Sequence, residues 1–246
     1  MTVLLFFIAA LLYASVGFGG GSTYNALLII AEYDFRLIPI IALSCNVAVA
    51  LGNCLRYQKN DLIPWRFSIP LIGISVPASF FGGSIHISEI IFMVLLGLAL
   101  ISSGIFMLLK PNKYGPNQKK RKHQNYLNMA ISLLLGFLAG IIGIGGGIFF
   151  APILHLQNIL PSKGISAFSS VFILINSLAG ILGQLYKNKG AMIDFAFNEY
   201  SLLIIAVILG GQIGNYFGVR IFSGAIVRRL TSVLVIYVGI RLIINI

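Results

Sequence analysis

A glycine-rich run occurs twice along the chain, as Gly17-Phe18-Gly19-Gly20-Gly21 and as Gly143-Ile144-Gly145-Gly146-Gly147. Each run directly follows a full-length apolar segment and opens a shorter one, residues 19–31 or 145–160. A glycine inside a helix costs about 1 kcal/mol relative to alanine, so three in succession predict that the helix breaks there. Each pair of segments is therefore one broken span, or a long helix followed by a half-helix.

The composition around these runs is that of a membrane protein. Of the 246 residues, 58% are hydrophobic and 9% are charged, against roughly 25% charged in a soluble domain. The charges form short clusters between apolar stretches of about 20 residues, the length of helix that crosses a bilayer. We expect an all-α, polytopic membrane protein with eight spans, or ten if both short segments cross. The uncharged start of the chain is expected to be a retained membrane segment, because a secretory signal begins with basic residues.

The net charge of +11 is concentrated in one place, since six basic residues lie between Lys110 and Lys122. A single basic loop between membrane segments is a topology signal, so we do not expect nucleic-acid binding. The positive-inside rule predicts that this linker, residues 110–125, is cytoplasmic. It separates an N-terminal transmembrane repeat, residues 1–109, from a C-terminal one, residues 126–246. Beyond the linker, basic residues fall on both sides, so the orientation of the second half stays open.

The second half resembles the first. The two glycine runs are 126 residues apart, and Ala42-Leu43-Ser44 matches Ala167-Phe168-Ser169 at an offset of 125. We therefore predict two homologous repeats of four to five helical segments, each with a glycine-broken helix. Four spans per repeat would make the halves parallel, and five would make them inverted. Duplicated membrane halves are typical of secondary transporters, whose substrate site lies between the repeats.

The helix breaks are the candidate binding site. A break inside the membrane leaves backbone N–H groups without partners, and the positive end of the following helix favours an anion. Uncharged side chains nearby would orient such an anion without holding it too tightly. The alternatives are that glycine allows only a turn or a close helix contact, and that the polar side chains join helices. The candidate substrate-binding residues are Gly19, Gly20, Gly21, Ser22, Thr23, Asn25, Ser44, Asn46, Gly145, Gly146, Gly147, Ser169, Ser170 and Asn176.

The sequence offers nothing for catalysis or metal binding. It has no Gly-x-Ser-x-Gly motif and no phosphate-binding Gly-Lys-Ser/Thr, and its three histidines have no carboxylate or thiol at ligand spacing. Cys45 and Cys54 are nine residues apart, which places them on opposite faces of a helix. We therefore expect no enzyme activity, no metal and no cofactor.

The two glycine runs, the Ala151-Pro152 that follows the second, the two Ala-x-Ser helices and the basic central linker together resemble the TauE/SafE family of membrane transporters. The resemblance covers essentially the whole chain. It implies a multi-pass secondary transporter of a prokaryotic inner or plasma membrane, associated with export of sulfite, sulfoacetate and related anions. One departure is that the first repeat has Asn25-Ala26 where the second has Ala151-Pro152, so the two halves are expected to contribute unequally.

The predicted function is therefore transport of a small anion across the lipid bilayer, with alternating exposure of a site near the midplane. Its energy source stays open between proton co-transport and the membrane potential, because no span carries a carboxylate at its centre. The alternatives are a non-transporting membrane scaffold or assembly subunit, and a channel, for which the polar positions are too few. The identity of the anion, the direction of transport and any homo-oligomer are left open.

Overall fold

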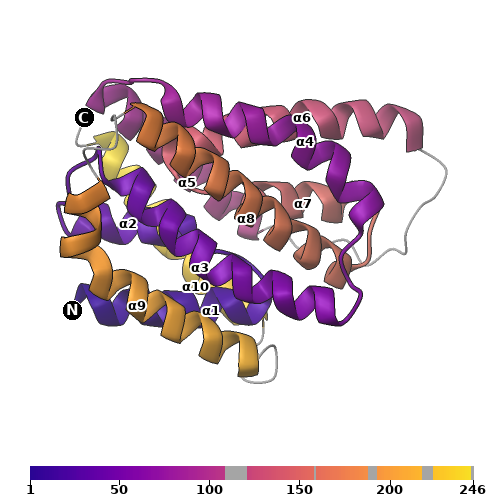
Figure 1. The fold of residues 1–246 in the computed structure, drawn as a ribbon, viewed down its shortest axis with the longest axis horizontal. Coiled ribbons are helices and arrows are strands. Elements are labelled where there is room, and N and C mark those ends of the chain that lie inside the picture. The colour runs from indigo at the N-terminus through magenta and orange to yellow at the C-terminus, as the bar shows by residue number, and fades with distance from the viewer. Residues whose placement is uncertain (109–120, 158, 188–192, 218–223, 245–246) are drawn as a thin grey trace.

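The computed structural model describes residues 1–108, 121–157, 159–187, 193–217 and 224–244. This part of the chain is helical and contains no strand, which confirms the predicted all-α class (Figure 1). The helices are α1 (Thr2–Val16), α2 (Gly21–Ile30), α3 (Ile38–Lys59), α4 (Trp65–Ser84), α5 (Glu89–Leu108), α6 (Arg121–Ile142), α7 (Gly147–Gln157), α8 (Ser162–Lys187), α9 (Ile193–Phe217) and α10 (Gly224–Ile244).

Length and composition separate the long helices from the short ones. Five described helices are long and apolar enough to cross a membrane, namely α3, α4, α5, α6 and α8, and three shorter apolar stretches lie in α1, α9 and α10. By contrast, α2 has 10 residues and α7 has 11. Such helices are about 15 Å long, half the thickness of the hydrocarbon core. Neither can cross alone, so they are half-helices.

Both glycine runs break the chain as predicted. The first long helix ends at Val16, Gly20 precedes α2 with φ 94°, and α2 begins at Gly21. In the second run α6 ends at Ile142 and α7 begins at Gly147, with Gly146 at φ 71°. An ordinary L-residue would be strained at these two positive φ values. The glycines are thus needed for the shape of the break as well as for its position.

Glycines also set how closely the long helices pack. Gly136 and Gly140 of α6 lie directly against the backbone of Ser75 and Ser79 in α4. In the same way Gly210 and Gly214 of α9 lie against the backbone of α1. Small residues of this kind let membrane helices approach until their backbones touch. Both stripes are therefore packing surfaces.

These contacts also give the direction of each helix. Gly210 lies against Phe7 and Gly214 against Leu11, so α1 and α9 are parallel. The Ser75–Gly136 and Ser79–Gly140 contacts make α4 and α6 parallel in the same way.

The central pair is antiparallel. Leu43 near the start of α3 packs against Gly180 near the end of α8. Tyr57 near the end of α3 is hydrogen-bonded to Ser166 near the start of α8. The same holds for α5 and α10, in which Gly97 meets Gly239 and Gly104 meets Ser232.

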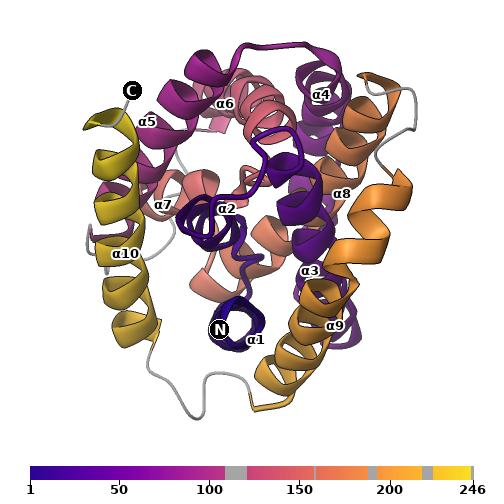
Figure 2. The same ribbon diagram turned by 90° about the vertical axis from the view of Figure 1, so that its left-hand side faces the viewer.

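The second half therefore runs opposite to the first, helix by helix. α1, α3 and α5 run one way and α4 the other, while α6, α8 and α10 run against the first group and α9 with it. The starts of α1 and α6 consequently lie at opposite ends of the bundle (Figure 1). Figure 2 looks along the bundle and shows α2 near its middle, with longer helices around it. We call the end where α5 stops and α6 starts the linker face, and the other end the opposite face.

Candidate functional site

The two helix breaks meet in the interior of the bundle. A Cβ added to Gly21 would lie 2.8 Å from the Ile144 carbonyl oxygen, so the first residue of α2 touches the second glycine run. From there α2 leads to the start of α3, and α7 leads to the start of α8. Since α3 and α8 are antiparallel, the two half-helices point away from each other. Their N-termini, which carry the positive ends of the helix dipoles, converge at one place.

Asn46 of α3 lies between these N-termini. Cβ atoms added to Gly21 and Gly145 would lie 2.5 and 3.1 Å from its Nδ2, and one added to Gly19 would lie 2.5 Å from its Oδ1. The side chain is completely buried, its Nδ2 reaches the Gly143 carbonyl only at 3.5 Å, and its Oδ1 has no partner. A hydrogen bond of that length is weak. The Asn46 amide is therefore the polar group with the most unused capacity at this place.

Ile173 of α8 faces Asn46 across the breaks and was missed in the sequence. Cβ atoms added to Gly19, Gly145 and Gly147 would all lie 2.6 to 3.1 Å from its side chain. The two central helices thus contribute one amide and one apolar side chain, so the halves are unequal at their meeting point. An isoleucine within an apolar helix gives no signal in a sequence, because its neighbours there are distant in the chain.

Polar residues from one half hold the break of the other. Asn25 Nδ2 donates to the Ile142 carbonyl at 2.9 Å, and Ser170 Oγ donates to the Gly17 carbonyl at 2.7 Å. Both carbonyls belong to residues at the ends of long helices, where the break leaves them without helical donors. Asn25 and Ser170 therefore stabilise the broken backbone.

The remaining predicted side chains divide into two groups. The Oγ atoms of Ser22 and Ser169 and the Oδ1 atom of Asn176 are buried without a hydrogen-bond partner, as is Ser177 Oγ beside Gly145. Thr23 is engaged with the Tyr13 hydroxyl at 2.9 Å, and Ser44 donates to the Ile40 carbonyl of its own helix. Thr23 and Ser44 are thus committed to local contacts, whereas the first group keeps free polar atoms.

Gly20 and Gly146 lie at the breaks but face away from Asn46. A Cβ on Gly20 would meet the rings of Tyr13 and Tyr24, and one on Gly146 would meet the Leu135 carbonyl and the Phe172 ring. Gly19, Gly21 and Gly145 are the glycines that border the Asn46 amide. Gly20 and Gly146 therefore shape the backbone of the breaks, whereas the other three glycines leave room around the Asn46 amide.

The site contains helix N-termini and neutral polar groups. Every charged residue of the described helices lies within six residues of a helix end, and the described residues contain no cluster of side chains suited to a metal ion. Asn25, Asn46 and Asn176 have no exposed surface. The structure is therefore closed around the breaks.

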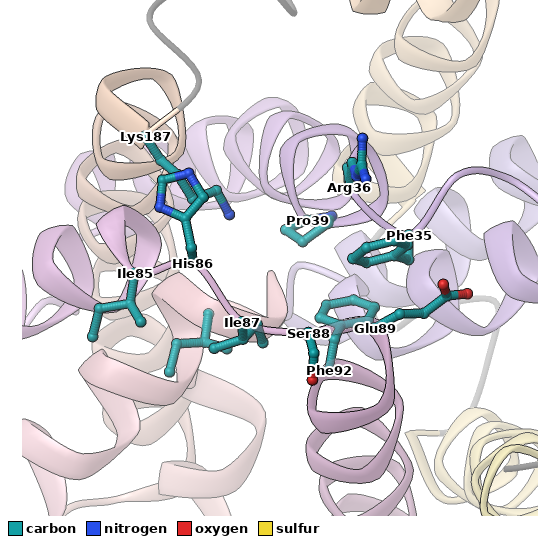
Figure 3. A pocket seen from close by; sticks show the side chains of 11 residues that line it. Phe35, Arg36, Pro39, Ile85, His86, Ile87, Ser88, Glu89, Phe92 and Lys187 are labelled. Carbon is teal, nitrogen blue, oxygen red and sulfur yellow. The ribbon is translucent and has the colours of Figure 1, made fainter.

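Two cavities lined by described residues lie at the opposite face. One, of about 540 Å³, lies between the starts of α3 and α5 and the ends of α6 and α8 (Figure 3). The other, of about 600 Å³, adjoins it and shares Phe35, Arg36, Glu89 and Phe92. Neither reaches Asn46.

Comparison with known proteins gives a consistent result. The sequence profile of the family described as "Sulfite exporter TauE/SafE" matches residues 2–242. Three relatives, all described as probable membrane transporter proteins, align over most of their length. They are y4hK of Sinorhizobium fredii (31% identity, 97% of this chain and 95% of the relative), MJ0441 of Methanocaldococcus jannaschii (27%, 85% and 80%) and YunE of Bacillus subtilis (24%, 98% and 96%). No solved structure matches.

Proposed function

Because this chain belongs to the sulfite exporter TauE/SafE family, we propose that it is a secondary transporter that exports a small sulfur oxyanion or organosulfonate, of the sulfite or sulfoacetate kind. The observation that carries the proposal is the convergence of the α2 and α7 N-termini on Asn46. Two positive dipole ends and a buried amide, with no basic side chain in the middle of any described helix, suit an anion that must bind and then leave.

The anion would be held mainly by backbone groups. The first N–H groups of a helix have no partner inside the helix, and here two such ends face one another. Asn46 would turn its amide so that Nδ2 points to the anion, and Ser22, Ser169 and Ser177 would add hydroxyl donors. A hydrogen bond to a charged group contributes about 1.5–3 kcal/mol. A few such bonds give enough affinity without trapping the anion.

The two halves would act as inverted repeats. The packing supports this, because contacts between the halves come in equivalent pairs. The first helix of each half packs against the fourth helix of the other half, α1 against α9 and α6 against α4. In addition, α3 packs against α8, and α5 packs against α10. In such transporters one half rocks against the other around a fixed central site. The observed state, closed around Asn46, would be an intermediate between opening to either face.

The linker face would be cytoplasmic. Among the described helices and loops, this face carries eight basic residues and one acid, whereas the opposite face carries three basic residues and five acids. By their positions at the starts of α8 and α10, Lys163, Arg228 and Arg229 belong to the linker face. The basic residues of both halves therefore favour the same face as the cytoplasmic one under the positive-inside rule.

The decisive test is transport by Asn46→Leu. Leucine keeps the branched shape of asparagine but removes the amide, so we expect flux of sulfite or sulfoacetate in proteoliposomes to fall by about tenfold or more. Flux would be measured with a proton gradient and with a membrane potential imposed separately, and with a carboxylate as the control anion. The dependence on each gradient would also identify the energy source.

The matched control is Asn128→Leu. Asn128 of α6 is completely buried and neither of its amide atoms has a partner, yet it belongs to neither break. This variant should transport like the parent chain. Equal flux in the Asn46→Leu variant and the parent would disprove the central site. Absence of any anion flux in the parent under both gradients would favour the scaffold alternative.

A further inference from the structure

The cavity of about 540 Å³ at the opposite face combines basic side chains with two helix N-termini. Arg36, His86 and Lys187 line it, together with the residues that open α3 and α5. Figure 3 shows the Lys187 side chain beside the His86 ring, with its nitrogen directed into the open middle of the cavity. The three basic groups come from three separate segments of the chain, so only the fold brings them together.

The negative charges near this cavity are turned elsewhere. Glu89 also lines it, but Figure 3 shows its carboxylate beyond the rings of Phe35 and Phe92, away from Lys187. Asp34 accepts a hydrogen bond from the Arg36 backbone at 2.9 Å, and it lines the neighbouring cavity with Glu32. In the described part of the chain no carboxylate forms an ion pair with Arg36 or Lys187. The Lys187 nitrogen therefore faces the middle of the cavity without a carboxylate partner among the described residues.

The starts of α3 and α5 add to this positive potential. α3 begins at Ile38 and has no side-chain cap, and Ser88 ahead of α5 accepts the Ile91 N–H only at 3.4 Å. The N-terminal ends of both helices, each at least 20 residues long, border the same space. Helix N-termini of this kind attract anions.

A thin layer separates the cavity from the central site. Pro39 and Ile141 line the cavity, and a Cβ on Gly143 would lie 2.7 Å from Pro39 Cα. Gly143 also offers its carbonyl to Asn46. Pro39 precedes Asn46 by seven residues on α3, which is about 10 Å along the helix. The Pro39–Gly143 contact therefore lies between the cavity and Asn46.

We propose that this cavity is an anion vestibule, in which Arg36, His86 and Lys187 hold a small oxyanion next to the Pro39–Gly143 contact that closes the central site. The inference rests on the proposed transport of an anion and adds the place where the anion waits at the opposite face. The same chemistry would also fit a lipid phosphate. We assign the vestibule to the soluble oxyanion, and the test separates the two sources.

The test measures the electrostatic potential in the cavity with a cysteine reporter. Ser88→Cys would be introduced into a chain in which Cys45 and Cys54 are replaced by alanine, and the protein placed in vesicles of zwitterionic phosphatidylcholine. The reporter is modified with an anionic (sulfonatoethyl) and with a cationic (trimethylammonioethyl) thiosulfonate. Adding Arg36→Gln and Lys187→Gln should lower the ratio of the anionic to the cationic rate by about fivefold or more, since two nearby charges are lost.

The control removes the same charge from the linker face. Lys59→Gln with Arg66→Gln should leave the Ser88→Cys ratio unchanged, and modification by uncharged N-ethylmaleimide should be equal in all variants. Asn46→Leu should also leave the ratio unchanged. The ratio of modification rates therefore reports on the vestibule even if the central site transports no anion. Failure of the vestibule proposal can thus be distinguished from failure of the proposed transport function.

Competition identifies the occupant. Sulfoacetate should slow anionic modification in the parent reporter chain and have no effect after the Arg36→Gln and Lys187→Gln changes. A ratio that does not respond to these changes would overturn the proposal. So would protection by phosphatidylglycerol in the vesicles together with no effect of sulfoacetate, because the cavity would then hold a lipid headgroup.

Discussion

The glycines of one run differ in their structural roles. Gly20 has a positive φ and packs against two tyrosine rings, whereas Gly21 has ordinary helical geometry and borders Asn46. A substitution at Gly20 would therefore disturb folding before it disturbs binding. Gly21 is the better position at which to test the site, because an added methyl group there meets Asn46 and the residue does not need a positive φ.

We predict that Gly21→Ala abolishes most transport. The new Cβ would lie 2.5 Å from Asn46 Nδ2 and 2.8 Å from the Ile144 carbonyl, so it would displace the amide and narrow the space between the half-helices. Transport in proteoliposomes should fall by about tenfold or more, a size consistent with loss of one charge-assisted hydrogen bond. The unfolding temperature in detergent should also fall, because the Ile144 carbonyl is a backbone group that must shift, so transport is compared at equal amounts of folded protein.

Gly73→Ala is the control for this change. Nothing lies within 4 Å of a Cβ added to Gly73 of α4, and alanine is favoured over glycine in a helix by about 1 kcal/mol. The variant should transport normally and be equally or slightly more stable. Parent-like transport by Gly21→Ala would show that the space beside Asn46 is not used.

At the scale of the helices, the contacts between α4 and α6 and between α1 and α9 depend on glycine. Gly140 lies against the backbone of Ser79 and Gly83, and Gly214 lies against the backbone of Leu11. Because backbone atoms cannot rotate away as side chains do, even one methyl group must separate the helices. These pairs join the two halves of the chain, so their separation would weaken the whole bundle.

Gly140→Ala is accordingly predicted to destabilise the protein. Overpacking of this kind typically costs about 1–3 kcal/mol, and here the obstacle is backbone on the neighbouring helix. We expect a lower unfolding temperature in detergent and a smaller folded fraction after purification, with Gly73→Ala again as the control. An unfolding temperature equal to that of the parent would mean that α4 and α6 are not held as closely as described.

For the whole molecule, the directions of the helices predict which loops are exposed on each side of the membrane. Asn60 follows α3 at the linker face, and Ser88 precedes α5 at the opposite face. In intact cells Ser88→Cys should react with a thiol reagent that does not cross membranes, and Asn60→Cys should react only after the cells are opened. Both variants are made in the chain in which Cys45 and Cys54 are replaced by alanine. The reverse pattern would place the linker outside, against the positive-inside rule.

The membrane class, the helix breaks and the amide at the centre of the candidate site could all be predicted from the order of the residues. Hydropathy, glycine propensity and the helical spacing of polar residues are local properties, and a chain of this composition can satisfy its backbone in a bilayer only as helices.

The folded structure was needed to find the inverted directions, the meeting of the two breaks and the position of Ile173 opposite Asn46. It also separated Gly20 and Gly146 from the glycines that border the site, and it gathered Arg36, His86 and Lys187 around one cavity. These features depend on which segments pack together across more than a hundred residues of chain. The neighbours of a residue in the sequence do not contain that information.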